Sequence, residues 1–212
     1  MGNAYTRIKQ PELVRRALLD HAAKLAVEQG LAAVTVQAVS DAAGVTKGGF
    51  THHFPSKQAL IDTVFHELLE RLGHDLDRRM EADAEHYGAF TRAYLEAVFD
   101  MDQSAKGSPW AALSISMLTD PKLRVSWTQW FQERLERHEA TDSDVQLTAI
   151  RLAADGLWLA DLTGVALGER IELRNHLLQH TYEQGVERPH EAANSRTGRS
   201  KKNGKNVRMA TS

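Results

Sequence analysis

Apolar residues recur every three or four positions along most of this chain of 212 residues, and this spacing restricts the fold more than any other feature. Residues at i, i+3 and i+4 lie on one face of an α-helix, which can then be buried against other helices. No stretch alternates apolar and polar residues between turn signals, as a half-buried β-strand would. The sequence therefore predicts an all-α fold.

Prolines and small polar residues indicate where these helices begin and end. All five prolines stand at a helix start or outside a helix, where the missing N–H group costs nothing. We expect Gly30 to end the first helix in the left-handed conformation. Thr35, Thr46 and Ser56 are expected to cap the next three helices at their N-termini. The expected helices cover approximately residues 11–29, 36–43, 47–54, 57–72, 90–98, 109–117, 121–135, 144–167 and 170–184.

Composition narrows the class of protein. With 42% hydrophobic and 25% charged residues, the chain resembles an ordinary globular protein. It has no cysteine, which excludes a disulfide, a thiolate metal site and a catalytic thiol. No apolar run approaches the roughly 18 residues that a membrane span needs, and residues 1–6 lack the apolar core of a secretory signal. We therefore expect a soluble cytoplasmic protein with no membrane partner.

The formal net charge of −2 is unevenly distributed. Residues 1–54 hold 6 Lys and Arg against 4 Asp and Glu, whereas residues 55–186 hold 13 against 22. A mildly basic head on an acidic body suggests a small anion-binding module attached to a larger unit. We therefore divide the chain into a first domain, residues 1–55, and a second domain, residues 56–186, with residues 56–73 as the connecting helix.

The last segment, residues 187–212, holds 7 basic residues against 2 acidic ones. It has no aromatic residue and no apolar periodicity, so we expect a disordered basic tail. Such a tail could contact phosphates without sequence preference, but charge alone favours a solvated terminus.

Residues 35–57 have the spacing of a helix-turn-helix unit. Gly44 supplies the tight turn between two short helices, and Val45 can pack between them. In such a unit the second helix enters the DNA major groove, which is about 12 Å wide and admits a helix. This segment therefore points to DNA binding.

Two adjacent glycines stand in the second of these short helices. Each costs about 1 kcal/mol relative to alanine in a helix interior, so Gly48 and Gly49 favour a close approach of the backbone to a neighbouring surface. If Phe50 and Phe54 form the buried side, both glycines and His52 lie opposite. The alternative is that the glycine pair forms a loop and Phe50 only covers a core. Periodicity alone leaves the two readings nearly even.

Three stretches join a turn glycine, a capped short helix, a closing aromatic residue and a Ser-Lys helix start at fixed offsets. They are residues 35–39 (TVQAV), 42–50 (AAGVTKGGF) and 52–60 (HHFPSKQAL). Together they strongly resemble the TetR/AcrR family of bacterial transcriptional regulators, over about the first 65 residues. A weaker likeness covers residues 153–160 (AADGLWLA), which are similar to the helix through which such proteins dimerise.

The resemblance implies a fold, a function and a set of DNA contacts. Members are all-α homodimers, usually repressors, with a three-helix DNA-binding domain and a larger helical domain that binds a small-molecule inducer and dimerises. The positions that the family pattern places on or beside DNA are Thr35, Gln37, Thr46, Lys47, Gly48, Gly49, Thr51, His52, His53 and Lys57. Lysines and hydroxyls near helix N-termini suit phosphate oxygens. The family commonly has tyrosines where Thr51 and His53 stand and a larger residue at Gly49, so the operator sequence does not carry over.

The second domain is rich in large aromatic and sulfur-containing side chains. We expect a group of them to line a pocket for a small apolar or aromatic inducer. The group is Phe90, Tyr94, Met101, Trp110, Met117, Trp127, Trp130, Phe131 and Trp158. For any single member, plain core packing is the favoured alternative. Asp161 follows Trp158 by three positions and is the candidate polar anchor, although it could equally lie at a dimer seam or face solvent.

Residues 144–167 and 170–184 are expected to form a four-helix bundle with the same helices of a second subunit. Gly156, Gly164 and the alanines at 149, 153, 154 and 160 permit close helix approach. DNA geometry also requires a dimer, because two recognition helices reach successive major-groove faces only about 34 Å apart.

Signatures of catalysis and metal binding are weak. His66 begins a zincin-like motif, but Glu70 stands where the second histidine must be. His66, Glu70 and His74 share one helix face, where a solvated surface is favoured over a metal site, and His176 and His180 lack a third ligand nearby in sequence.

We therefore expect no enzyme, no cofactor and no metal, but a ligand-responsive repressor that binds an operator in double-stranded DNA. Two alternatives stay open: an all-α enzyme that uses the tryptophan-rich cavity, and a DNA-binding scaffold that responds to no effector.

Overall fold

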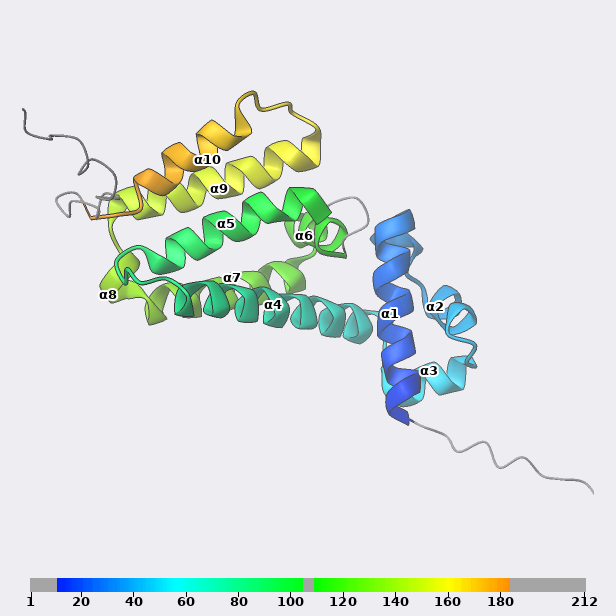
Figure 1. Ribbon diagram of the computed structural model, residues 1–212. Helices are drawn as coiled ribbons and strands as arrows, with labels where there is room; N and C mark the ends of the chain where they lie inside the picture. Colours follow the sequence, from blue (N-terminus) through cyan, green and yellow to red (C-terminus); the bar gives the residue numbers. More distant parts are fainter. Residues whose placement is uncertain (1–10, 105–108, 184–212) are drawn as a thin grey trace, which may run out of the picture.

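The computed structural model describes residues 11–104 and 109–183, which contain helices and no strand (Figure 1). The all-α prediction is confirmed. The expected basic tail, residues 187–212, lies outside the described residues. The helices are α1 (Pro11–Gln29), the short 3₁₀ helix η1 (Leu31–Ala33), α2 (Val36–Ala42), α3 (Lys47–His53), α4 (Lys57–Glu81), α5 (Ala89–Ser104), α6 (Pro109–Thr119), α7 (Pro121–Arg137), α8 (Glu139–Asp142), α9 (Val145–Thr163) and α10 (Arg170–Gln179).

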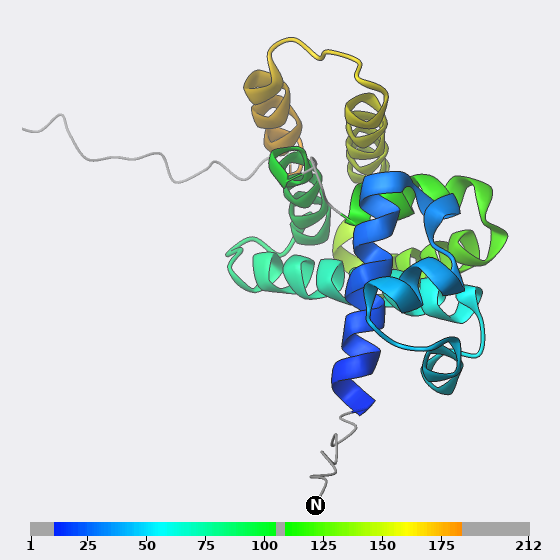
Figure 2. The ribbon, with the colours of Figure 1, turned by 90° about the vertical axis from the view of Figure 1, so that its right-hand side faces the viewer.

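The helices form a small head and a larger body. Figure 1 shows α1, α2 and α3 together at one end of the molecule, with α4 running from them along the body. Figure 2 looks onto the head, with α9 and α10 at the far side of the body from α4. The head also contacts the body through α6, which packs against α1 and η1.

Helix α1 buries Leu18, Ala22 and Ala26 at helical spacing, which gives the head its core. It ends at Gln29 as expected, but Gly30 has φ 80° and ψ 166°, outside the left-handed helical region that the sequence predicts. With ψ extended, the chain leaves the helix axis directly and enters η1 instead of closing a left-handed cap.

Helix α4 connects the two parts and is longer than expected. Ser56 caps it, since its hydroxyl accepts a hydrogen bond from the Ala59 N–H at 3.1 Å. The helix continues past residue 73 to Glu81, and Leu76 is fully buried in the added turns. Gly73 lies inside the helix, and a Cβ at this position would stand 2.5 Å from Nη2 of Arg134. The glycine makes room for that guanidinium.

The apolar stripe of α4 belongs to two different cores. Its first half, including Leu60 and Phe65, packs with α1 and α3 in the head core. Its second half, including Leu72 and Leu76, packs with α5 and α9 in the body core. Head and body are therefore joined by one continuous helix and not by a flexible linker.

Helix α5 lies at the centre of the body between α4 and α9. The turn before it requires glycine, because Gly88 has φ 72° and a Cβ there would stand 2.2 Å from the Thr181 carbonyl oxygen. Arg92 ties the same region to the end of the described chain by donating to the carbonyl oxygens of Tyr87 at 2.8 Å and Thr181 at 3.0 Å.

Three helix bounds in the second half of the body differ from those expected. The expected polar break at residues 140–143 contains the short helix α8. Helix α9 ends at Thr163 and not at residue 167, because Gly164 adopts the left-handed conformation with φ 73° and ends the helix there. Helix α10 ends at Gln179, several residues before the expected 184.

Candidate nucleic-acid interface and ligand cavity

The α2–α3 unit is built from local signals. The Thr35 hydroxyl accepts from the Ala38 N–H at 3.1 Å and caps α2. The Thr46 hydroxyl accepts from the Gly49 N–H at 3.1 Å and caps α3. Between them Gly44 has φ 65°, a left-handed conformation that glycine adopts without steric cost. These caps and the turn glycine match the helix-turn-helix geometry that the sequence predicts.

Helix α3 has one buried side and one exposed side. Phe50 and the C-cap residue Phe54 are buried, with ring centroids 6.0 Å apart, and anchor the helix to the head. Figure 1 shows α3 on the outside of the head, on the side of α1 that faces away from the body. The exposed residues of α3 are Lys47, Gly48, Thr51 and His52, while Gly49 and His53 are half-buried. The exposed side of α3 is thus polar, and Gly48 keeps part of it free of side chains.

Gly48 and Gly49 are helical, so the structure excludes the loop alternative. No neighbour in the described chain requires glycine at Gly48, because the nearest heavy atom to a Cβ there would be the Thr46 hydroxyl at 3.8 Å. At Gly49 a Cβ would make ordinary contacts of 3.5 Å and 3.6 Å with Val45 and Thr46. The helix penalty of about 1 kcal/mol per glycine is therefore not explained by packing within the head.

Several candidate DNA contacts already have partners inside the head. The Thr51 hydroxyl donates to the carbonyl oxygens of Lys47 and Gly48, at 2.9 and 3.2 Å. Gln37 donates to Asp41 at 2.8 Å. Lys57 is half-buried and donates through Nζ to the Leu31 carbonyl oxygen at 3.2 Å, which leaves two of its three donors for a phosphate.

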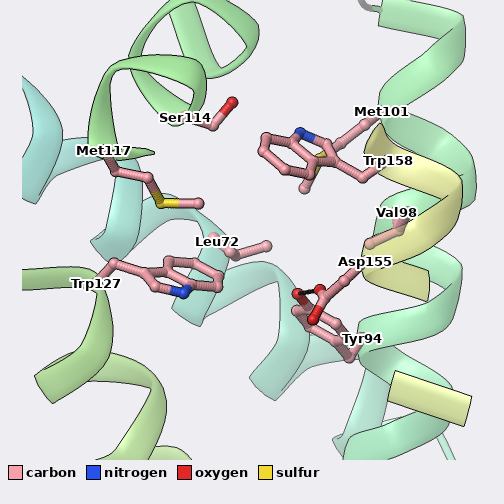
Figure 3. A pocket seen from close by; sticks show the side chains of 9 residues that line it. All are labelled: Leu72, Tyr94, Val98, Met101, Ser114, Met117, Trp127, Asp155 and Trp158. Carbon is pink, nitrogen blue, oxygen red and sulfur yellow. Dashed lines mark hydrogen bonds between the residues drawn. The ribbon is translucent and has the colours of Figure 1, made fainter. Parts of the chain in front are cut away.

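The body holds a cavity of about 170 Å³ between α4, α5, α6, α7 and α9 (Figure 3). Five of the residues that the sequence predicts for a pocket line it. They are Tyr94, Met101, Met117, Trp127 and Trp158. Four further residues complete the lining. They are Leu72, Val98, Ser114 and Asp155. Helices far apart in the sequence therefore bring aromatic rings, methionines and one carboxylate to the same space.

The other predicted pocket residues do not line this cavity. Phe90 is fully buried and stacks on the His138 ring at 5.2 Å. Phe131 and Trp130 pack beside Trp127 on α7, with Phe131 and Trp127 centroids 5.3 Å apart. The favoured alternative of core packing applies to these three. The side chain of Trp110 lies outside the described residues.

Asp161 is not a polar anchor of this cavity. Its two carboxylate oxygens accept from Arg170, at 2.7 and 2.9 Å, where the chain returns from α9 into α10. The carboxylate in the cavity is that of Asp155, which, like Asp161, lies three positions from Trp158. A spacing of three residues from Trp158 therefore does not tell which of the two aspartates faces the cavity. The turn that brings Arg170 to Asp161 distinguishes them. Leu72 and Val98 belong to predicted apolar stripes, while nothing in the sequence singled out Ser114.

Asp155 and Tyr94 form the polar end of the cavity. The Tyr94 hydroxyl donates to Asp155 at 2.5 Å, and Figure 3 shows this pair pointing into the space between the helices. Burial raises the pKa of the Asp155 carboxyl, while the hydrogen bond from Tyr94 and the nearby Arg151 charge oppose this shift. Burial and the adjacent carboxylate together raise the pKa of Tyr94 well above its ordinary value, so Tyr94 is a neutral donor.

The described residues contain no group of three or more metal-ligating side chains placed to hold a metal ion. His66 Nε2 lies 3.6 Å from a carboxylate oxygen of Glu70 on the exposed side of α4. Within the same part of the chain, no helix has the length and apolar character needed to span a bilayer.

Two family models match the chain. Residues 18–64 match the model described as "Bacterial regulatory proteins, tetR family", and residues 88–182 match "Tetracyclin repressor-like, C-terminal domain". The transcriptional regulator BetI of Pseudomonas paraeruginosa is 30% identical over 169 residues, which cover 72% of this chain and 84% of that protein. The chain belongs to the TetR family. It is a DNA-binding transcriptional regulator, and its family is one of regulators and not of enzymes.

One further relative and two solved structures resemble this chain to differing extents. The transcriptional repressor KstR2 of Rhodococcus jostii is 37% identical over 101 residues, 48% of this chain, so the match spans about half (47%) of that repressor's length. The multidrug-binding protein EbrR, solved with malachite green, has a TM-score of 0.63 at 19% identity over 80% of this chain and 98% of its own. A regulator from Saccharomonospora viridis, solved with choline, has a TM-score of 0.62 at 18% identity over 79% and 95%. At these identities the structural matches establish the shared fold.

Proposed function

We propose that this TetR-family regulator is a homodimeric repressor that a small apolar or aromatic ligand releases from its operator. One observation carries the proposal. Met117 of α6 and Trp127 of α7 line the cavity and also pack against the head core. A ligand in the cavity therefore touches side chains that support the DNA-binding head.

The proposed DNA contacts centre on the exposed side of α3. Lys47 follows the Thr46 cap, so its charge lies beside the N–H groups of the first turn, where a phosphate oxygen would be accepted. Gly48 leaves the backbone open to a base edge or a phosphate. The remaining candidates, Thr35, Gln37, Thr46, Gly49, Thr51, His52, His53 and Lys57, are proposed to contact the flanking DNA backbone or neighbouring bases.

The outer face of α9 supports a dimer. Val145, Leu152 and Leu159 recur every seven residues and are 83%, 64% and 49% exposed. Ala149 and Gly156 fall between them, Thr163 follows, and all three are exposed, so the face has an apolar seam with small residues. An apolar stripe of this length on one helix favours burial against a second copy.

Helix α10 supports the same conclusion. None of its ten residues is buried within the described chain, and Ile171 is 75% exposed. An isolated helix of this length is marginal in water, so packing must hold it in place. In the described chain it is attached by ion pairs of Arg170 with Asp161 at 2.7 Å and of Arg174 with Glu96 at 2.8 Å, and by Leu177 and Leu178, which pack against the body core. We propose that a second subunit covers the remaining faces of α9 and α10.

The proposed coupling runs through α4 and α6. Leu72 of α4 and Met117 of α6 both line the cavity, while α4 enters the head core and α6 contacts α1. A ligand that binds better when these helices shift would change the separation of the two heads in the dimer. Differential binding of about 1–3 kcal/mol is typical of such coupling. Malachite green and choline in two structures of this fold support a small organic molecule as the ligand.

The test is selection of DNA. The purified protein should enrich one sequence from a random pool at low ionic strength, and a small-molecule screen should find compounds that release it. Substitution of Met117 by alanine should weaken release more than it weakens DNA binding. A protein that prefers no sequence over bulk competitor would refute the DNA-binding proposal, and operator binding that no cavity ligand changes would favour the scaffold without an effector.

A further inference from the structure

The cavity is lined by aromatic rings, methionines and a single carboxylate. Trp127 and Trp158 flank the space, Tyr94 closes one end, and Met101 and Met117 add sulfur (Figure 3). Figure 3 shows the Asp155 carboxylate pointing from α9 into the same space. The faces of tryptophan and tyrosine rings carry negative electrostatic potential and attract cations within about 6 Å. Rings and carboxylate therefore favour the same sign of charge in a ligand.

The Asp155 carboxylate is only partly satisfied by the protein. Its one hydrogen-bond donor among the described residues is the neutral Tyr94 hydroxyl, whereas a carboxylate can accept about four bonds. Arg151 on the preceding turn donates to other groups: the Thr91 hydroxyl at 2.6 Å, the Asp142 carbonyl at 3.0 Å and the Thr148 hydroxyl at 2.9 Å. No bond from this guanidinium to Asp155 occurs in the described part of the chain.

The buried charges near the cavity do not balance. Arg151 interacts electrostatically with two carboxylates, Asp142 and Asp155. Asp142 is buried and is held by the Thr91 N–H at 2.8 Å and hydroxyl at 2.7 Å. One guanidinium thus faces two carboxylates, which leaves this group of three one negative charge in excess when both are ionised. Buried charge without a partner is unfavourable, so the cavity gains from a cation beside Asp155.

The pKa of the Asp155 carboxyl is also shifted from its ordinary value. Burial raises it, because the ionised carboxylate loses hydration in the cavity. A cation in contact with the carboxylate would replace the lost hydration and favour the ionised form.

We propose that the cavity binds a compact organic cation, an alkylated ammonium whose charge lies against Asp155 and whose apolar substituents contact Trp127 and Trp158. This inference rests on the ligand site of the proposed function and specifies its chemistry. The cavity of about 170 Å³ sets the size, since an apolar cavity of about 150 Å³ holds a benzene molecule. An ammonium with several methyl groups fills such a space without a hydrogen-bond donor of its own, so the carboxylate acts through charge.

The experiment compares cations with an uncharged counterpart. Choline and benzyltrimethylammonium are the cationic probes, and 3,3-dimethylbutan-1-ol has the shape of choline without its charge. Binding to the full chain is measured by tryptophan fluorescence and by calorimetry in the absence of DNA. We expect at least one cation to bind, and choline to bind more than about tenfold tighter than the alcohol, given the strength of desolvated cation–π contacts.

Two variants assign the effect to one carboxylate. Asp155→Asn should remove most of the preference for choline over the alcohol. Asp161→Asn, a matched change on the same helix outside the cavity, should retain it. The inference is overturned if neither cation binds, if the alcohol binds as well as choline, or if Asp155→Asn keeps the preference. The comparison of choline with the alcohol needs no variant, so it decides the question even if Asp155→Asn does not fold.

The outcome is separate from that of the proposed function. If uncharged ligands release the protein from its operator while cations do not bind, the cation inference fails and the repressor proposal stands. If cations bind as expected but no operator is found, the repressor proposal fails and the cation site stands.

Discussion

Replacing Lys47 by alanine should flatten the salt dependence of operator binding. Lys47 is the first residue of α3, is exposed, and follows the Thr46 cap, a position suited to a phosphate contact. Each phosphate neutralised contributes about 0.9 to the slope of log K against log salt. A dimer loses two contacts, so the slope should fall in magnitude by about 1.8. Between 50 and 200 mM salt, the affinity of the variant should therefore fall by a factor about twelve smaller than that of the wild type.

The assay is fluorescence anisotropy of a labelled operator, titrated with protein at several salt concentrations in that range. Lys122→Ala is the matched control, because Lys122 is an exposed lysine in the first turn of α7, on the body. Its slope should equal that of the wild type. If Lys47→Ala leaves the slope unchanged, or if Lys122→Ala lowers it equally, the placement of the phosphate contact at the start of α3 is wrong.

Three further predictions concern the body. Leu152→Glu places a charge on the exposed face of α9 and should yield monomers in sedimentation equilibrium; an unchanged dimer would exclude that face as the interface. Gly88→Ala places a Cβ at a left-handed φ and against the Thr181 carbonyl oxygen, so it should lower the free energy of unfolding in urea titrations by more than about 2 kcal/mol. Gly168 has open space around it, so Gly168→Ala should change the free energy of unfolding little. Burial raises the folded-state pKa of Asp155. The free energy of unfolding of the wild type, relative to that of Asp155→Asn, should therefore decrease as pH rises from about 4, where the unfolded carboxyl titrates, through the raised pKa. A difference between the two proteins that does not vary with pH would contradict this.

The sequence by itself determined the head. Thr35, Thr46 and Ser56 cap their helices, and Gly44 turns the chain, through interactions that span three or four residues. Such signals are contained in a short stretch, so residue type and spacing are sufficient to predict them. For α3, periodicity left the helix and the loop nearly even; once the segment is helical, its period places Phe50 and Phe54 on the buried side.

Only the tertiary structure determined which side chains line the cavity. Asp155 and Asp161 lie at equal spacing from Trp158 on one helix; the sequence offered Asp161 as a cavity anchor with a dimer seam or solvent equally open, whereas Asp155 lines the cavity. Arg170, brought back by the turn after α9, donates to Asp161, while the Tyr94 hydroxyl of α5 donates to Asp155. Likewise, the space for the Arg134 guanidinium beside Gly73 exists only because α7 packs against α4. Partners that meet across five helices depend on how the chain returns on itself, and the spacing within any one helix does not contain that information.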